Sequence, residues 1–200
     1  MKLRGLYAIT PESGESEALL RQVAQALEGG IACLQYRRKA RQNAREARAL
    51  AVLCRASGVP FIVNDDVDIA LAAGADGVHL GRDDGDVAAA RLKLKGKILG
   101  VSCYDSLAAA RGAVAAGANY IAFGSVFASP TKPGAVRAPL SLFSEARALG
   151  VPLAAIGGIT LEDAPQVLAA GADALAVISD LFDAPDIAAR ARAYGKLFRQ

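Results

Sequence analysis

Residues 171–178 read Gly171-Ala172-Asp173-Ala174-Leu175-Ala176-Val177-Ile178, and the chain contains four versions of this phrase. In each, an Ala-rich stretch with helical spacing runs into glycine, then alanine or isoleucine, and then an apolar run. Glycine adopts the left-handed conformation that ends a helix without steric cost, so each copy predicts a junction between a helix and a strand. The other copies are Gly29-Gly30-Ile31-Ala32, Gly74-Ala75-Asp76-Gly77 and Gly117-Ala118-Asn119-Tyr120.

Apolar runs follow all four copies, as expected for strands that are buried on both faces, and four more runs lie between them. Helical patterns alternate with these strands, for instance at residues 15–27, 43–57, 106–116 and 140–149. This order predicts an α/β protein, a (β/α)₈ TIM barrel that forms a single compact domain over residues 1–200. A doubly wound open sheet is the alternative. The predicted strands cover residues 6–9, 33–36, 61–63, 78–80, 98–102, 120–123, 153–156 and 175–178.

The composition fits one globular domain, because 53% of the 200 residues are hydrophobic and 22% are charged. A net charge of +3 is too small to predict nucleic acid or a membrane as a partner, whereas small anionic molecules stay plausible. We expect no membrane span and no secretory leader, and the odd number of cysteines without metal-ligand spacing predicts a cytoplasmic protein. The sequence leaves a homo-oligomer open.

Cysteine and histidine limit the chemistry of the chain. Cys33, Cys54 and Cys103 lack metal-ligand spacing, and we interpret them as reduced, packed side chains. His79 is the only histidine, which excludes a site with several histidine ligands. Any metal ion must therefore be bound mainly by carboxylates.

The second predicted strand ends in a cationic segment. If the chain stays extended, Gln35, Arg37 and Lys39 alternate onto one face. In a barrel of this kind the carboxyl ends of the strands line the active site, so one amide and two cations would converge there. The alternative is that Arg37, Arg38 and Lys39 begin a solvated loop.

Acidic residues follow the third and fourth predicted strands. Asp65 ends the segment Val63-Asn64-Asp65, and Asp84 lies shortly after His79. Neighbouring strands lie about 4.8 Å apart, so these carboxylates predict a Mg²⁺ site that a substrate diphosphate completes. We interpret Asp66, Asp83 and Asp86 as helix caps or surface acids and His79 as a packed interior residue.

The last two predicted strands lead into loops that commonly bind phosphate in these barrels. One contains Gly157 and Gly158, whose backbone N–H groups can approach an anion, although a plain turn is the alternative. A third loop, residues 124–135, has two prolines, Ser129, Thr131 and Lys132, a composition that suits a lid that binds phosphate, although a mobile surface loop is the alternative. The residues at the carboxyl ends of the predicted strands thus indicate one site for a metal-bound diphosphate and another for a monophosphate.

These motifs, in this order, resemble the thiamine phosphate synthase family over essentially the whole chain. Arg38 and Arg82 depart from what many relatives carry, but neither lies in the predicted site. The matching segments are Leu34-Gln35-Tyr36-Arg37-Arg38-Lys39, Val63-Asn64-Asp65, His79-Leu80-Gly81, Thr131-Lys132-Pro133-Gly134 and Ile156-Gly157-Gly158-Ile159-Thr160.

The resemblance implies a transferase that condenses 4-amino-2-methyl-5-hydroxymethylpyrimidine diphosphate with a thiazole phosphate, giving thiamine phosphate and pyrophosphate. It implies that Gln35 contacts the aminopyrimidine, and that Asp65 and Asp84 bind Mg²⁺. Ser102 would lie beside the reacting groups. The diphosphate would be bound by Arg37, Lys39, Asn64 and Lys132, and the phosphates further by Ser129 and Thr131 and by the backbone of Gly158, Ile178 and Ser179. The catalytic set would be Arg37, Lys39, Ser102 and Lys132.

Two other functions compete with this one. A thiazole tautomerase of the same superfamily would place a histidine inside the Phe-Gly-x-Val-Phe segment, where this chain has Ser125, and would lose the Thr131-Lys132 pair. A non-catalytic regulator that senses phosphate ligands is the second, and the predicted metal site disfavours it.

Overall fold

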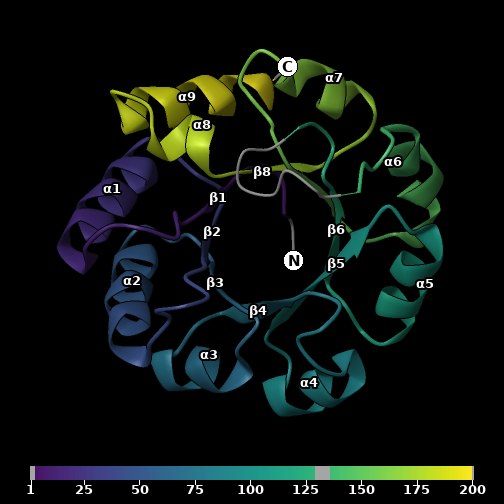
Figure 1. Cartoon of the computed structure of the whole chain (residues 1–200), viewed down its shortest axis with the longest axis horizontal. Coiled ribbons are helices and arrows are strands. Elements are labelled where there is room, and N and C mark those ends of the chain that lie inside the picture. Colours follow the sequence, from purple (N-terminus) through teal and green to yellow (C-terminus); the bar gives the residue numbers. More distant parts are fainter. Residues whose placement is uncertain (1–2, 129–135, 200) are drawn as a thin grey trace.

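The computed structural model describes residues 3–128 and 136–199 of the chain. Within these residues eight parallel strands close into a barrel in chain order, and helices surround it (Figure 1). Closure is direct, because Gly5 of the first strand pairs with Ala174 of the last. The TIM barrel is therefore confirmed, and the open sheet is wrong. The strands are β1 (Gly5–Ile9), β2 (Cys33–Tyr36), β3 (Phe61–Asn64), β4 (Gly77–Leu80), β5 (Ile98–Tyr104), β6 (Tyr120–Gly124), β7 (Leu153–Ile156) and β8 (Ala174–Val177).

The helices follow the predicted alternation with small shifts at their ends. The segment predicted as one helix at residues 140–149 ends in a tighter 3₁₀ turn, Arg147–Leu149, before Gly150. The helices are α1 (Ser16–Glu28), α2 (Ala44–Ala56), α3 (Val67–Ala73), α4 (Val87–Leu94), α5 (Leu107–Ala115), α6 (Ser141–Ala146), α7 (Ala164–Ala169), α8 (Ser179–Phe182) and α9 (Ile187–Leu197).

The repeated phrase has the conformation that it predicts. Gly30, Gly74, Gly117 and Gly171 all have positive φ, between 68° and 110°. The polar residue of the phrase has a role that the sequence did not reveal. Asp76 accepts a hydrogen bond from the Phe61 backbone N–H at 2.8 Å, and Asp173 does the same for β7. Each such side chain joins the amino-terminal ends of adjacent strands, at the face of the barrel opposite the cavity described below.

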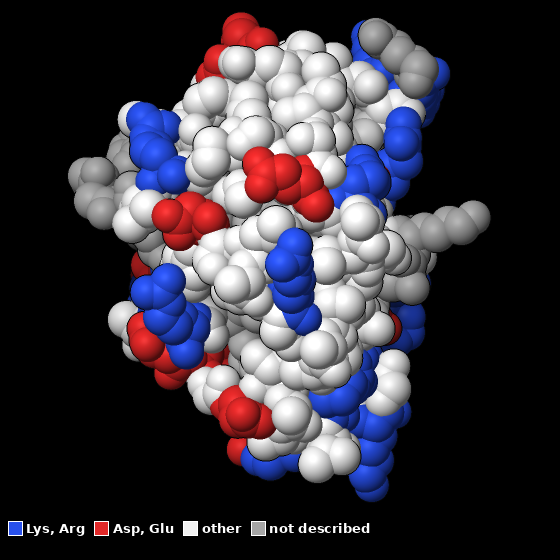
Figure 2. All heavy atoms as spheres, turned by 90° about the vertical axis from the view of Figure 1, so that its right-hand side faces the viewer, with Lys and Arg blue, Asp and Glu red and all other residues white. Residues whose placement is uncertain are grey.

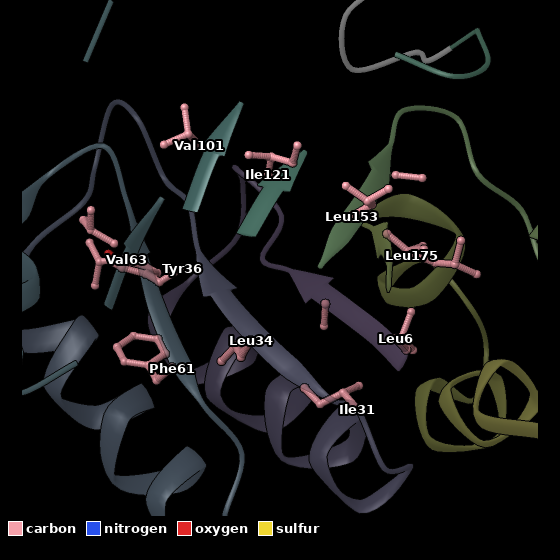
Figure 3. Packing of buried hydrophobic residues seen from close by; sticks show 14 of the residues in the cluster. Leu6, Ile31, Leu34, Tyr36, Phe61, Val63, Val101, Ile121, Leu153 and Leu175 are labelled. Atoms are coloured by element: carbon pink, nitrogen blue, oxygen red, sulfur yellow. The ribbon is translucent and has the colours of Figure 1, made fainter. Parts of the chain in front are cut away.

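The hydrophobic core has two layers because side chains alternate along each strand. Outward-facing side chains, Leu34, Phe61 and Leu175 among them, belong to the larger layer between the barrel and its helices (Figure 3). The inner layer fills the barrel and includes the large residues Tyr7 and Tyr120. Its members from β7 and β8 are alanines: Ala154, Ala174 and Ala176.

The surface matches the modest net charge. Basic and acidic side chains are interspersed over the face that Figure 2 shows. In residues 3–128 and 136–199, none of the helices has the length and apolar character needed to cross a membrane.

Candidate active site

A cavity of about 490 Å³ lies at the carboxyl ends of the strands, and all eight strands contribute to its wall. It gathers every predicted site residue that the structure describes: Gln35, Arg37, Lys39, Asn64, Asp65, Asp84, Ser102, Gly158, Ile178 and Ser179. The other three, Ser129, Thr131 and Lys132, lie outside the described residues.

The cationic segment after β2 alternates as the sequence predicts, with Arg37 and Lys39 at the cavity and Arg38 buried away from it. Thr10 fixes the backbone at this point, because its hydroxyl accepts a hydrogen bond from the Arg37 N–H at 2.8 Å. The Arg37 guanidinium contacts Glu12 at 2.9 Å. The side chain of Arg37 is only 15% exposed and that of Arg38 is buried, so the solvated-loop alternative is wrong for these two residues, whereas Lys39 lines the cavity and is half exposed.

The two predicted metal ligands face each other across the ends of β3 and β4. The carboxyl groups of Asp65 and Asp84 lie close to each other, and the Lys39 ammonium lies 3.1 Å from Asp65. Burial and the neighbouring Asp84 raise the pKa of Asp65 to about 6. Burial works against ionisation of Asp84 too, but hydrogen bonds from Asp65 and from the Gly81 N–H hold its pKa below the usual value.

The other acids take the roles expected of them. Asp66 caps α3 through the Ile69 N–H and Asp86 caps α4 through the Ala89 N–H, each at 2.7 Å. Asp83 is exposed. At the ends of β3 and β4 the cavity is therefore lined by the carboxylates of Asp65 and Asp84 and not by those of these neighbours; Asp180 and Asp183 line it near α8.

The opposite wall of the cavity is built from backbone. Gly157 and Gly158 have φ of 106° and 63°, and a Cβ at Gly158 would collide with the Ala128 carbonyl. Ile178, predicted to end the last strand, instead leaves it and precedes α8 with φ −113° and ψ −85°. The nearby carboxylate of Asp180 is compensated, because Arg190 and Tyr194 bind it at 3.2 and 2.7 Å.

His79 lies inside the barrel, as predicted. Its ring nitrogens contact the hydroxyls of Tyr120 and Ser102, both at 2.9 Å. Burial lowers the pKa of His79 from 6.5 to about 4, so the ring is neutral near pH 7.

We expect this shift to lower the free energy of unfolding as the pH falls from 6.5 toward 4. In that range the unfolded chain binds a proton at His79 and the folded protein does not, which costs at most roughly 3 kcal/mol. Asp65 has the opposite effect, because its raised pKa favours the folded state at low pH and that stability is lost as the pH rises through about 6.

Urea unfolding of the wild type and of His79→Gln at pH 7 and pH 4.5 isolates the histidine. The Asp65 contribution is common to both proteins and cancels in their difference. The wild type should lose more stability than the variant on acidification. An equal loss in both would show that His79 is not the buried neutral group described here.

Known proteins resemble this chain throughout. The profile of the family described as "Thiamine monophosphate synthase" matches residues 6–181. The protein named thiamine-phosphate synthase of Aromatoleum aromaticum is 60% identical, and the match covers 98% of this chain and 97% of that protein. The chain belongs to the thiamine monophosphate synthase family. Another member, the thiamine-phosphate synthase of an Azoarcus species, is 56% identical, with 98% of both proteins covered.

The barrel is also that of the thiamine monophosphate synthase family. The solved structure of a thiamine phosphate pyrophosphorylase from Pyrococcus furiosus matches with a TM-score of 0.86 and 35% identity, over 99% of this chain and 96% of that one. The family profile spans all the predicted site residues, from Gln35 to Ser179.

Sequence reasoning missed Tyr7, which lines the cavity, and Tyr120, which packs against Tyr7 inside the barrel. Both are buried, and their hydroxyls contact each other at 2.6 Å. The available signal was a tyrosine at an inward position of an otherwise apolar strand, where its hydroxyl needs a partner. The partners themselves come from distant parts of the chain.

Proposed function

We propose that this cavity couples an aminopyrimidine diphosphate to a thiazole phosphate, releasing pyrophosphate and forming thiamine phosphate. The observation that carries the proposal is the asymmetry of the cavity. One wall brings together Arg37, Lys39 and two carboxylates, which suits a metal-bound diphosphate, and the other offers glycine-rich backbone, which suits a monophosphate.

The protein's part in the chemistry is electrostatic. The C–O bond between the pyrimidine methylene group and the diphosphate breaks, its electron pair leaves with pyrophosphate, and the thiazole nitrogen supplies the pair for the new C–N bond. No proton needs to move. Arg37, Lys39 and Lys132 would stabilise the departing charge, and Asn64 would orient the diphosphate. Gln35 would contact the aminopyrimidine, and Ser102 would lie beside the reacting groups.

The second substrate would be held by its phosphate. The hydroxyl groups of Ser129 and Thr131 would donate hydrogen bonds to this phosphate. The backbone N–H groups of Gly158, Ile178 and Ser179 would bind the same anion, since all three residues line the same cavity as the diphosphate site.

Asp65 and Asp84 fit a Mg²⁺ ion. Their carboxyl groups lie close together, and burial and the neighbouring Asp84 raise the pKa of Asp65, so a cation bound between them would offset the repulsion of the two negative charges. Among the described residues no cluster of three His, Cys, Asp or Glu side chains could hold a metal, so water and diphosphate oxygens would complete the shell. When bound, the ion would neutralise charge on the leaving pyrophosphate. A cytoplasmic location and a homo-oligomer stay predictions.

Residue 125, where a tautomerase would have a histidine, is a serine that cannot act as a base. Ser125 is buried, and its hydroxyl donates a hydrogen bond to the Phe127 carbonyl at 2.6 Å. It therefore has no free base to offer a thiazole ring, which favours the synthase.

The reaction itself tests the proposal. Protein supplied with the aminopyrimidine diphosphate, a thiazole phosphate and Mg²⁺ should release pyrophosphate and thiamine phosphate in equal amounts. If it only isomerises a thiazole phosphate, the tautomerase replaces the synthase. If it binds the ligands without Mg²⁺-dependent turnover, the protein is a non-catalytic regulator and not a synthase.

Replacing Arg37 with Ala should slow coupling by roughly a hundredfold or more, about 3 kcal/mol, because a charge that stabilises the leaving group is lost. Lys132→Ala should behave alike. Binding of the thiazole phosphate, measured by calorimetry, should change much less. Arg41→Ala is the matched control, since Arg41 is an exposed arginine in the same loop that does not line the cavity. Equal effects of Arg37→Ala and Arg41→Ala would contradict the role.

A further inference from the structure

A continuous row of hydrogen bonds crosses the floor of the barrel and joins side chains from five strands. Gln35 of β2 donates from Nε2 to the hydroxyl of Tyr7 on β1 at 2.8 Å. The Tyr7 hydroxyl contacts that of Tyr120 on β6 at 2.6 Å, and Tyr120 contacts Nδ1 of His79 on β4 at 2.9 Å. His79 Nε2 then meets the hydroxyl of Ser102 on β5 at 2.9 Å. The two ends are proposed substrate residues, whereas the three middle residues have no assigned role.

An amide nitrogen only donates, so the Tyr7 oxygen accepts from Gln35. Either hydroxyl of the Tyr7–Tyr120 contact can be the donor, and the row runs in one direction when the Tyr7 hydrogen goes to Tyr120. Tyr120 then donates to His79 Nδ1. A neutral imidazole carries one hydrogen, which must lie on Nε2 and is donated to Ser102.

This direction fixes what each end presents to the cavity. The Gln35 nitrogen is engaged by Tyr7, so its Oε1 is the atom left to accept a hydrogen bond from a ligand. The Ser102 oxygen accepts from His79, so its hydroxyl hydrogen is left to donate. One end thus complements an amino group and the other an acceptor atom.

The packing holds the row rigidly. The His79 ring stacks on Tyr120 with centroids 5.6 Å apart, and Tyr7 meets Tyr120 edge-on at 5.8 Å. Gly100 makes room for this arrangement, because a Cβ there would collide with the Tyr120 ring. Phenylalanine would fill the same space without two buried hydroxyls that need partners. Packing alone therefore does not explain why these positions carry hydroxyl groups.

We propose that Tyr7, Tyr120 and His79 are positioning residues: their one-way row of hydrogen bonds holds the Gln35 amide with its oxygen toward the cavity and thereby selects a pyrimidine with an amino group over one with a carbonyl oxygen at the same position. The selectivity rests on the proposed function, since it needs Gln35 to contact the pyrimidine. The direction of the hydrogen bonds in the row does not depend on the proposed function.

The single histidine gives a direct test of that direction. In protein labelled with ¹⁵N-histidine, the nitrogen shifts of His79 should report a neutral ring protonated at Nε2 and bare at Nδ1. In Tyr120→Phe, where Nδ1 loses its donor, this pattern should change. A wild-type ring protonated at Nδ1 would mean that the row runs the opposite way, and would overturn the proposal without touching the proposed function.

Binding of two non-reacting ligands tests the selectivity. In both, a carbon atom replaces the bridging oxygen of the pyrimidine diphosphate; one carries the amino group and the other a carbonyl oxygen. Calorimetry with Mg²⁺ should show that the wild type prefers the amino ligand, and that Tyr7→Phe lowers this preference about tenfold because the Gln35 amide is free to turn. In a Gln35→Ala background Tyr7→Phe should have no further effect on the preference.

Tyr36→Phe is the matched control, because it removes a buried hydroxyl that binds Glu46 outside the barrel interior, and it should keep the wild-type preference. An unchanged preference in both Tyr7→Phe and Tyr120→Phe would overturn the selectivity, as would additive effects of Tyr7→Phe and Gln35→Ala. If the wild type binds neither ligand, the proposed function fails, and the histidine signal still decides whether the row exists.

Discussion

Replacing Asp65 or Asp84 with Ala should reduce Mg²⁺-dependent coupling by at least about a thousandfold, because the metal ion supplies several kcal/mol of stabilisation to a departing anion. The two carboxyl groups lie close together at the cavity wall, and the described residues add no third His, Cys, Asp or Glu to make a cluster of three possible ligands. Coupling rates over a range of Mg²⁺ concentrations, together with calorimetry of Mg²⁺ and pyrophosphate binding, measure the loss.

Asp83→Ala is the control, because Asp83 is adjacent in sequence and exposed. It should retain most of the activity. If Asp83→Ala proves more damaging than Asp84→Ala, the assignment of the second ligand is wrong. Near-native activity of both Asp65→Ala and Asp84→Ala, in protein that is still folded, would remove the metal site altogether.

Most of the fold could be predicted because the determining signals are local. A glycine with positive φ at each junction, such as Gly171, and an apolar run after it define a helix end and a strand without any knowledge of distant contacts. The polar ends of the strands could be predicted as well, since a period of two places Arg37 and Lys39 on the same side once β2 is extended. The exact end of the last strand could not, because Ile178 leaves the ladder only where α8 begins.

The floor of the cavity could not be predicted, because it depends on closure of the barrel. Tyr7 and Tyr120 are 113 residues apart, and only the closed arrangement of strands brings their hydroxyls together. In the sequence each is one aromatic residue in an apolar run. The pairing of Arg37 with Glu12 was hidden for the same reason, since Glu12 lies in the loop before α1.

Arg38 departs from the family pattern, yet it is one of the most buried side chains of the described residues. Its guanidinium contacts Glu46 of α2 at 3.3 Å, and the two side chains are 1% and 3% exposed. Tyr36 donates to the same carboxylate at 2.6 Å, and Arg38 also donates to the Ser13 carbonyl at 3.2 Å. The pair therefore joins the end of β2 to α2 and to the loop before α1.

We expect Glu46→Ala to lower the free energy of unfolding by about 3–5 kcal/mol, because it leaves the Arg38 charge buried without a counter-charge. Urea unfolding would measure this loss of stability, provided that the dependence of the unfolding free energy on urea concentration is the same in the wild type and the variant. Glu17→Ala is the control, since it breaks an exposed pair with Arg21 at 3.8 Å and should cost less than about 0.5 kcal/mol.

The same substitution should weaken pyrophosphate binding in whatever protein remains folded. Arg37 and Lys39 flank Arg38 in the chain, so an Arg38 side chain that moves out toward water displaces the backbone that holds both cations at the cavity. Replacing the pair together, as Arg38→Met with Glu46→Leu, removes the buried charge and should recover much of the stability that Glu46→Ala loses. If the double variant is as unstable as Glu46→Ala, the loss comes from packing and from the Tyr36 hydroxyl, which loses its acceptor in both variants, and not from an uncompensated charge.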